Sequence, residues 1–495
     1  MSPTSDTKEE ANVEPAQDLY PITDLDEGIV GWEDQDDPLN PRNFPKPRKW
    51  FLLALVSAIT LISPFASSVF APAVKDANRE FGNKSSILGE IAVTSYLFGY
   101  SAGPLFLSPL SELYGRRLTL NMSTCFFVLF QIGCALAPSL SSLIVFRLLT
   151  GIGGSACLTI GGGVISDLFI AEERGLAMSI FSFGPLMGPV LGPICGGFIA
   201  QGAGWRWVFW VLTISGGTMT SLVMIFNRET NPVVLISRKT VRLQKEYNRP
   251  DLRSYYTAKS NFRSMSNTYQ LLHSLTTPLR LLFRSPIVSM LALYIAFIYG
   301  CLYLLFTTVT DVFQDTYGWS LQISGLSYIG LGLGFITGQS VFGLLSDKII
   351  LRLKSRNAGV FEPEMRLPLS IVFAFFVPIS FFWYGWAVEA KTHWIVPIIG
   401  LVPFAFGFVG IFGTLQTYVI DSYPLHAASG IAAITICRSL FGALLPLAGP
   451  SMYQRLGYGW GNSLLGFITL AMIPMPAIFK RFGGSLRKKF VLESH

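Results

Sequence analysis

Long apolar blocks dominate the chain, and most of its polar residues lie between them. A helix needs about 20 apolar residues to cross the hydrocarbon layer of a membrane, which is roughly 30 Å thick. Every backbone group in that layer must be hydrogen-bonded within the protein, so a long apolar block predicts a transmembrane helix. Twelve blocks reach this length, six on each side of a polar central stretch. They cover residues 50–73, 87–108, 118–137, 141–163, 175–199, 207–226, 286–308, 321–344, 367–388, 394–417, 428–450 and 460–480.

This pattern predicts an all-α membrane protein with twelve transmembrane helices in two six-helix bundles. The composition agrees, because 51% of the 495 residues are hydrophobic and only 14% are charged, whereas a soluble protein carries about 25% charged residues. A soluble enzyme, a nucleic-acid-binding protein and a secreted disulfide scaffold are thereby excluded. All six cysteines fall within the blocks, which indicates packing positions rather than a disulfide framework.

Basic residues are distributed unevenly among the segments between the blocks. If both termini are cytoplasmic, 29 of the 37 Lys and Arg residues fall in cytoplasmic segments and only six in outside loops. Cytoplasmic segments of membrane proteins carry an excess of Lys and Arg. The distribution therefore predicts that both termini lie in the cytoplasm.

The segments outside the two bundles differ in charge. Residues 1–49 precede the first bundle, 50–227, and are rich in Asp and Pro, so we expect a disordered acidic tail. The central loop, 228–285, holds eleven basic and three acidic residues. We expect it to be a linker that is attracted to anionic headgroups, with a dedicated regulatory or partner site as the alternative. The second bundle covers 286–480, and a short cytoplasmic tail covers 481–495.

Two polar loops at corresponding places in the halves resemble each other, which suggests an internal repeat. The first reads SPLSELYGRR over residues 108–117, and the second reads GLLSDK over 343–348. Each places an acidic residue at a helix end, where a carboxylate can accept hydrogen bonds from the amides of a neighbouring helix and pair with Arg. We therefore expect a cytoplasmic gate composed of Glu112, Gly115, Arg116, Arg117 and Asp347.

The fifth block contains two small-residue series with a spacing of four. Gly184, Gly188, Gly192 and Gly196 lie on one helix face and would let a neighbouring helix approach closely. Pro185, Pro189 and Pro193 lie on the adjacent face, and each removes a backbone hydrogen bond, so the helix should bend. Two interpretations remain open at this point: simple tight packing, or a flexible dry seam that prevents ion leakage.

Two arginines lie inside predicted spans. Arg147 is in the fourth block, where an unpaired charge would cost several kcal/mol, so it should face a cavity or a partner. An Arg that snorkels to the outer headgroups is the alternative. The same argument applies to Arg438 in the eleventh block. The alternative is that backbone carbonyls at a helix bend accept its hydrogen bonds. Asp167 shares a helix with Arg147 and is the best carboxylate candidate for proton coupling, whereas the other acidic residues near spans are expected at helix ends.

Aromatic residues at helical spacing could line a substrate cavity. The candidates are Tyr96, Tyr100, Tyr294, Tyr299 and Tyr303. Rings with polar tips suit flat, partly apolar ligands, although aromatics in spans more often face lipid or other helices. No metal site is expected, because no cluster of metal-ligating residues has suitable spacing. Asn83 begins a glycosylation sequon in an outside loop.

Three stretches resemble the signatures of the major facilitator superfamily. SPLSELYGRR over 108–117 is similar to its loop signature, and LIVFRLLTGIGG over 143–154 is similar to its fourth-helix signature. GPVLGPICGG over 188–197 is similar to the fifth-helix motif of antiporters, which implies a role for Gly188, Pro189, Gly192, Pro193, Gly196 and Gly197.

A narrower resemblance is to the fungal drug:proton antiporters with twelve spans. It rests on DPLNPRN over 37–43, WRWVFW over 205–210, Glu229-Thr230, Tyr299-Gly300 and RSLFG over 438–442.

The resemblance implies a monomeric plasma-membrane efflux pump that works by alternating access. It would export drugs, toxins or a secondary metabolite, with the proton gradient as energy source, no cofactor and no nucleic-acid partner. A nutrient importer of the same fold and a non-transporting sensor remain alternatives, and we expect no enzyme activity.

Overall fold

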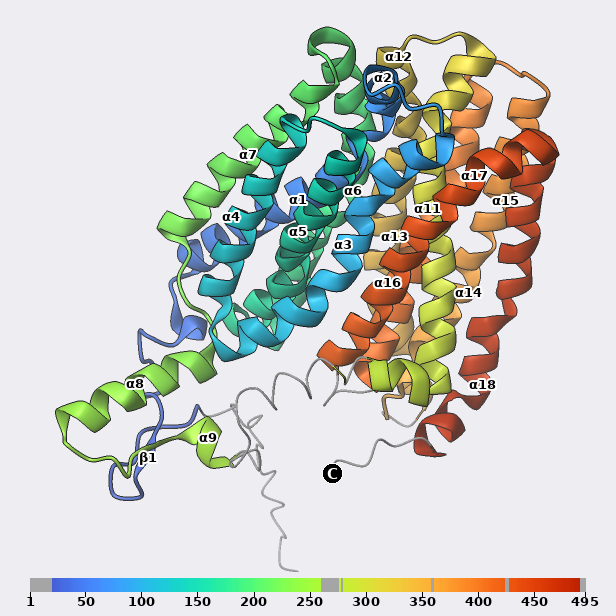
Figure 1. Ribbon diagram of the computed structural model, residues 1–495. Helices are drawn as coiled ribbons and strands as arrows, with labels where there is room; N and C mark the ends of the chain where they lie inside the picture. Colours follow the sequence, from blue (N-terminus) through green and yellow to red (C-terminus); the bar gives the residue numbers. More distant parts are fainter. Residues whose placement is uncertain (1–19, 260–275, 277–278, 358–359, 423–426, 490–495) are drawn as a thin grey trace, which may run out of the picture.

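The protein consists almost entirely of long helices that form two bundles, shown in the computed structural model in Figure 1. The structure describes residues 20–259, 276, 279–357, 360–422 and 427–489. Ten stretches of these residues are long and apolar enough to cross a membrane. One stretch holds two helices, because the helix α17 (Ala427–Met472) breaks at Gly457, where φ is 72°. With α3 (Ser86–Leu113), a further long helix, the described residues contain the twelve expected spans.

The N-terminal half comprises the helices up to Phe226. They are α1 (Lys46–Ser68), α2 (Val74–Glu80), α3, α4 (Arg116–Ala135), α5 (Leu140–Leu168), α6 (Ala171–Ala203) and α7 (Trp205–Phe226). Side-chain caps begin two of them, α3 and α5. At the start of α5, Ser139 Oγ accepts a hydrogen bond from Ser142 N, which satisfies an amide that the helix itself leaves free. The helix α1 starts four residues before the apolar block, because the polar residues in front of the block continue the same helix.

The C-terminal half begins at Pro286. Its helices are α11 (Pro286–Tyr317), α12 (Leu321–Gly325), α13 (Ile329–Arg356), α14 (Leu367–Ala374), α15 (Phe376–Glu389), α16 (Ile395–Ser422), α17 and α18 (Pro474–Lys489). The eighth expected span is thus α12 and α13 joined by a short 3-10 turn, and the ninth is α14 and α15. Each half has its own apolar core, and α3 packs along α17 between the halves.

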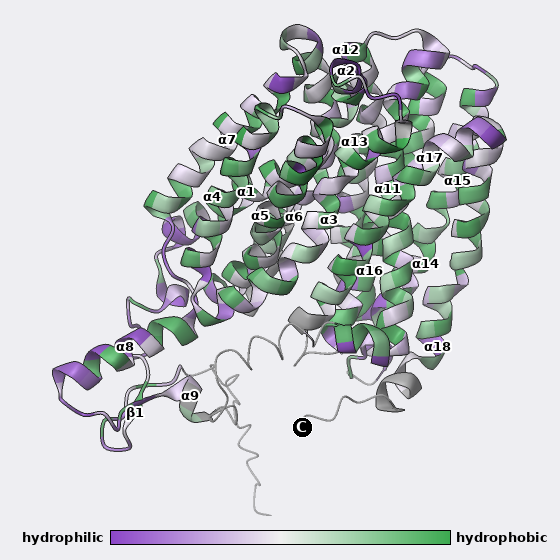
Figure 2. Ribbon diagram, viewed as in Figure 1, coloured by the Kyte–Doolittle hydropathy of each residue, from purple (hydrophilic) through white to green (hydrophobic). Residues whose placement is uncertain are grey.

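The ends of the bundles differ in character from their middle, as Figure 2 shows: hydrophobic residues follow the long helices, and hydrophilic residues gather at the ends and around α8 (Pro232–Glu246). We call the end that carries α2 and α12 the α12 end. The opposite end carries α8, α9 (Tyr255–Lys259) and α18, and we call it the α8 end.

Our expectation of disorder over residues 1–49 is wrong for residues 20–49. Residues 20–45, the N-terminal segment, pack against the central loop, and residues 46–49 open α1. In this segment β1 (Ile29–Val30) pairs in parallel with β2 (Arg253–Ser254). Residues 1–19 and 260–275 lie outside the described part of the chain.

A small apolar core holds the N-terminal segment to α8. Val30 and Trp32 are buried against Ile236 and Leu252, and Lys239 Nζ donates a hydrogen bond to Gly31 O over 3.1 Å. The net charge of the segment suggested disorder, but its few apolar residues find an apolar face more than 200 residues further along the chain. Such burial offsets the entropy of ordering the segment.

Candidate functional site

A small cavity lies between the two halves, where α1, α3 and α6 of one half face α11, α16 and α17 of the other. Its volume is about 40 Å³, which holds waters but no organic molecule, since small-molecule sites usually enclose about 300–1,000 Å³. In this conformation the cavity is therefore closed around its own side chains. A larger ligand could enter only if the halves moved apart.

Four of the five predicted tyrosines line this cavity in two facing pairs. The rings of Tyr96 and Tyr100 are stacked 5.5 Å apart, and those of Tyr299 and Tyr303 lie 5.0 Å apart. Tyr96 and Tyr303 hold their hydroxyl groups against serines of α1, and the hydroxyl groups of Ser67 and Tyr303 lie 2.8 Å apart across the halves. Tyr294 does not line the cavity; it lies in the core of the C-terminal half.

Arg438 brings a positive charge into the cavity wall. It is the one charged side chain among the described residues that line the cavity. Its guanidinium lies 5.1 Å from the ring centres of both Tyr299 and Phe412, and its Nε has no hydrogen-bond partner among the described residues. The cavity is therefore apolar and aromatic, with one cation whose hydrogen-bonding capacity is only partly used.

Arg147 does not line the cavity, so our expectation that it faces a cavity is wrong, but it does have partners and does not extend to the outer headgroups. It is 1% exposed inside the N-terminal half, where its Nη2 donates to Ser67 O over 3.1 Å and to Val93 O over 3.0 Å. Its guanidinium also lies 5.2 Å from the ring centre of Phe70. These contacts link α5 to α1 and α3, so Arg147 supports the wall from behind.

Contacts between the halves close the cavity at the α12 end. Lys75 Nζ on α2 lies 2.8 Å from Asp311 Oδ1 and 3.9 Å from Asp315 Oδ1 on α11. Nearby, the amide of Gln322 donates to Gln201 Oε1 over 3.0 Å. At the α8 end, by contrast, the ion pairs that the described residues form join residues of the same half.

The glycine face of α6 packs closely against a neighbouring helix, as the sequence predicts, and the structure identifies that helix as α1. A Cβ atom at Gly192 would lie 2.2 Å from Ser68 Oγ, and one at Gly196 would lie 2.0 Å from Val69 O. The prolines explain a further contact: Pro193 has no N–H to bond the carbonyl of Pro189, and Ser68 Oγ donates to that oxygen over 2.8 Å. Pro185 and Pro189 line the cavity, so α6 connects its glycine face to the cavity wall.

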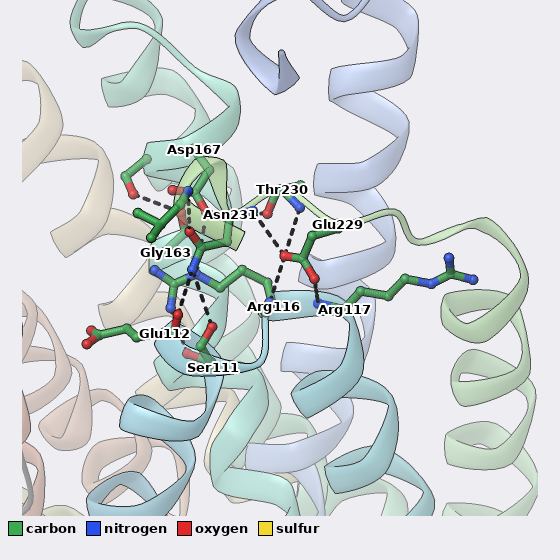
Figure 3. Close-up of polar contacts among 12 residues, drawn as sticks. Ser111, Glu112, Arg116, Arg117, Gly163, Asp167, Glu229, Thr230 and Asn231 are labelled. Atoms are coloured by element: carbon green, nitrogen blue, oxygen red, sulfur yellow. Dashed lines mark hydrogen bonds and ion pairs between the residues drawn. The ribbon is translucent and has the colours of Figure 1, made fainter. Parts of the chain in front are cut away.

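The helix α4 begins in a polar cluster that Figure 3 shows. Glu229 Oε1 accepts hydrogen bonds from the amides of Arg116, Thr230 and Asn231 over 2.8–3.1 Å. Its Oε2 accepts one from the amide of Arg117 over 3.3 Å. A carboxylate is favoured at this place, because the first amides of a helix are unpaired and carry partial positive charge.

We expected Glu112 to bind these amides, and that assignment is wrong in this structure. The Glu112 side chain is exposed and points away from the cluster (Figure 3), and only its backbone oxygen accepts a bond, from Asn231 Nδ2 over 3.3 Å. Gly115 lies directly before α4: its φ is 104°, and a Cβ there would lie 2.1 Å from Glu229 Oε2. Only glycine adopts this conformation without strain.

Asp167 and Arg116 form an ion pair beside this cluster. Arg116 Nε lies 3.4 Å from Asp167 Oδ2, and its Nη1 donates to Ser111 Oγ over 2.6 Å. Thr230 Oγ1 also donates to Asp167 Oδ2, over 3.3 Å. Through Arg116, Asp167 on α5 is thus linked to the start of α4 and to Ser111 near the end of α3, and it does not line the central cavity.

The remaining predicted residues lie at helix ends or outside the described part. An ion pair joins Arg366 to Asp421, in the place of the second half that corresponds to Asp167. The side chain of Asp347 lies outside the described residues, so its expected gate role stays a prediction. Asn83 donates through its amide to Asn78 Oδ1 over 2.9 Å, and its glycosylation also stays a prediction.

Two contributors were missed by the sequence analysis. Glu229 belongs to one of the family signatures, but the sequence does not indicate that it binds the amide of Arg116, which lies 113 positions earlier. For Lys75 the sequence contains no indication of a role, because its partner Asp311 lies on a helix of the other half.

Comparisons with known proteins agree with this architecture. The family model described as Major Facilitator Superfamily matches residues 56–446. The chain is 44% identical to the MFS transporter cpaT of Aspergillus oryzae, over 92% of this chain and 91% of that protein. It is 46% identical to the MFS-type transporter penM of Penicillium rubens, over 93% and 90% of the two chains. It is 42% identical to the efflux pump radE of Floropilus chiversii, over 93% and 85%.

Among solved structures, the fold is similar to that of the xylose transporter XylE from E. coli. A partially occluded inward-open form of XylE has a TM-score of 0.64 and 20% sequence identity, and the match covers 90% of this chain and 100% of that one. At this identity the likeness concerns the fold alone.

Proposed function

The chain belongs to the Major Facilitator Superfamily, and on that premise we propose that it exports a hydrophobic or amphiphilic small molecule in exchange for protons. It is a multi-pass membrane transporter and not an enzyme. Drugs, toxins and secondary metabolites of fungi are the substrate classes that we propose, and the fungal relatives named as transporters and as an efflux pump support them.

The central cavity is the single observation that carries this proposal. It lies between the halves, is lined by paired tyrosines, and is closed at one end by contacts that join the halves. Alternating access requires these contacts to break while the opposite end closes, because the site must open to one side at a time. The separate ion pairs at the α8 end leave the halves free to move there.

We further propose that the α8 end faces the cytoplasm of a fungal cell and that the protein acts as a monomer in the plasma membrane. The excess of Lys and Arg in the segments at this end supports the orientation. On this assignment the structure is closed to the outside. The proton gradient would supply the energy, and no cofactor would take part.

The chemistry of the cavity favours neutral or anionic aromatic substrates. Rings bury flat apolar surface, and Arg438 supplies one cation in a place of low dielectric, where an unpaired charge interacts strongly. A polycationic substrate would be repelled by this guanidinium.

Efflux from a pump-deleted yeast strain tests the function. Cells that express the protein are loaded with fluorescent aromatic compounds of either charge, with and without a protonophore. We expect efflux that the protonophore abolishes. Efflux that persists would reject proton coupling, uptake would favour the importer, and no movement of any compound despite surface expression would favour the sensor.

Arg438→Gln should lower the efflux of anionic aromatic substrates by at least about tenfold, which corresponds to ~1.4 kcal/mol. The variant keeps the approximate size of the side chain but removes its charge from the cavity wall. Arg455→Gln is the matched control, because Arg455 lies on the same helix but is exposed. Equal efflux by the two variants would remove Arg438 from the substrate site.

A further inference from the structure

A second cavity lies at the α8 end and has a volume of about 360 Å³. Three parts of the chain that are distant in sequence enclose it: the N-terminal segment with the first turn of α1, the start of α4, and the chain from the end of α7 into α8. It shares no lining residue with the central cavity. Its size suits a small ligand or the headgroup of a larger one.

Three arginines line this cavity: Arg48, Arg117 and Arg228. Arg117 extends away from Glu229 (Figure 3), and its Nη2 donates to the carbonyl of Met224 over 3.3 Å. The guanidinium of Arg48 lies 4.4 Å from the ring centre of Phe44, and Arg228 is exposed.

The positive charge of this cavity is not neutralised by its own wall. Glu229 is the one acidic residue among the described residues that line it. Both oxygens of that carboxylate accept hydrogen bonds from backbone amides of α4 and of the chain that follows α7. None of the three arginines forms an ion pair with another described residue, so an anion in the cavity would find guanidinium groups whose charge no carboxylate balances, and such groups suit the oxygens of a phosphate.

The cavity also lies where a membrane surface would be. Its wall is completed by Leu39 and Ile225, which are 58% and 69% exposed. Beyond it, the rings of Phe51 and Phe226 meet at 5.5 Å, and both are nearly half exposed. Phe51 lies in the second turn of α1, and Ile225 and Phe226 lie at the end of α7, where a transmembrane helix would pass from hydrocarbon to headgroups.

We propose that this cavity binds the phosphate-bearing headgroup of an anionic phospholipid from the cytoplasmic leaflet. The guanidinium groups of Arg48, Arg117 and Arg228 would hold the phosphate, and the acyl chains would run along Ile225 and Phe226. The assignment to the cytoplasmic leaflet rests on the orientation proposed above, whereas the binding site itself does not depend on it. The headgroup would also bind the N-terminal segment to α4, next to the cluster of Glu229.

Lipid binding by the purified full-length protein tests the proposal. Detergent-solubilised protein is titrated with phosphatidylserine or phosphatidylcholine, and the bound lipid is counted by native mass spectrometry. We expect preferential binding of phosphatidylserine. The double variant Arg48→Gln/Arg228→Gln should weaken it about 25-fold, because each basic side chain at an anionic membrane surface contributes about a factor of five.

The matched control is Arg352→Gln/Arg356→Gln, which removes the same charge from exposed positions at the end of α13. Equal losses in the two double variants would overturn the proposal in favour of a diffuse positive surface. Inorganic phosphate is titrated separately. Phosphate that binds in the wild type while phosphatidylserine does not would overturn the lipid assignment.

Two further readouts keep the outcomes distinct. Size-exclusion profiles and thermal unfolding report whether the variants fold, which we expect because the replaced side chains are not buried. The accessibility of an N-terminal tag in intact cells reports the leaflet. Since lipid binding is measured without transport, a failure of the efflux assay would leave this result unaffected.

Discussion

Gly192→Leu is expected to abolish efflux, with a rate at least about a hundredfold lower, equivalent to ~2.7 kcal/mol. A Cβ at this position would lie 2.2 Å from Ser68 Oγ and 2.9 Å from the amide nitrogen of Val69. Leucine adds three further carbons, so α6 must move away from α1 and release the bond from Ser68 to Pro189 O. Overpacking of this kind costs about 1–3 kcal/mol and sometimes more.

Gly202→Leu is the control for this prediction. Gly202 lies on the same helix, and a Cβ there would have no heavy atom within 4 Å. The control should therefore retain nearly normal efflux. Surface expression and size-exclusion profiles are measured for both variants, so that a loss of transport is separated from a loss of protein. Comparable efflux by the two would show that the seam between α6 and α1 does not limit transport.

Gly115→Ala is expected to destabilise the protein by about 3–5 kcal/mol and to lower efflux in parallel. Alanine at φ 104° and ψ 157° carries backbone strain of about 1–3 kcal/mol. Its Cβ would also displace Glu229, which lies 2.1 Å away. Hydrogen bonds to a charged group contribute about 1.5–3 kcal/mol, so the loss of this carboxylate adds a second penalty. Thermal unfolding of the purified variant measures the sum.

Gly204→Ala separates the two penalties. Gly204 also precedes a helix, with φ 93° and ψ 159°, but a Cβ there would have no neighbour within 4 Å. It should suffer the strain alone. The excess cost of Gly115→Ala should then vanish in a Glu229→Ala background, where the clash is gone. An excess that persists in this background would mean that Glu229 does not determine the need for glycine.

The twelve spans and the glycine series of α6 were predictable because they depend on residues that are consecutive or one turn apart. The membrane requires an apolar length of about 20 residues, and that length is visible in any window of the chain. In the same way, a spacing of four places Gly188, Gly192 and Gly196 on one face whatever the rest of the protein does. Because these glycines have no side chains, α1 can pack closely against that face.

The site depended instead on which distant residues meet. Arg147 and Arg438 look alike in sequence, since each is a lone cation in an apolar block, yet only Arg438 reaches the cavity. Whether such an arginine faces the cavity depends on how its helix is rotated within the bundle, and that rotation cannot be inferred from a single charged residue. Glu229 takes the role that we expected of Glu112 for a similar reason, because the amides of α4 are bound by whichever carboxylate the fold brings there.

The N-terminal segment shows the same division between local and distant information. Its charge and composition are typical of disorder, and that inference treats the segment as if it were alone in water. In the folded protein, Trp32 is buried against Leu252. Hydropathy and periodicity thus determined the membrane class, the spans and the glycine face of α6, because they act along the chain. Its cavity wall, its closing ion pairs and the carboxylate of α4 were decided by tertiary packing, because each joins side chains that only the fold brings within a few ångströms.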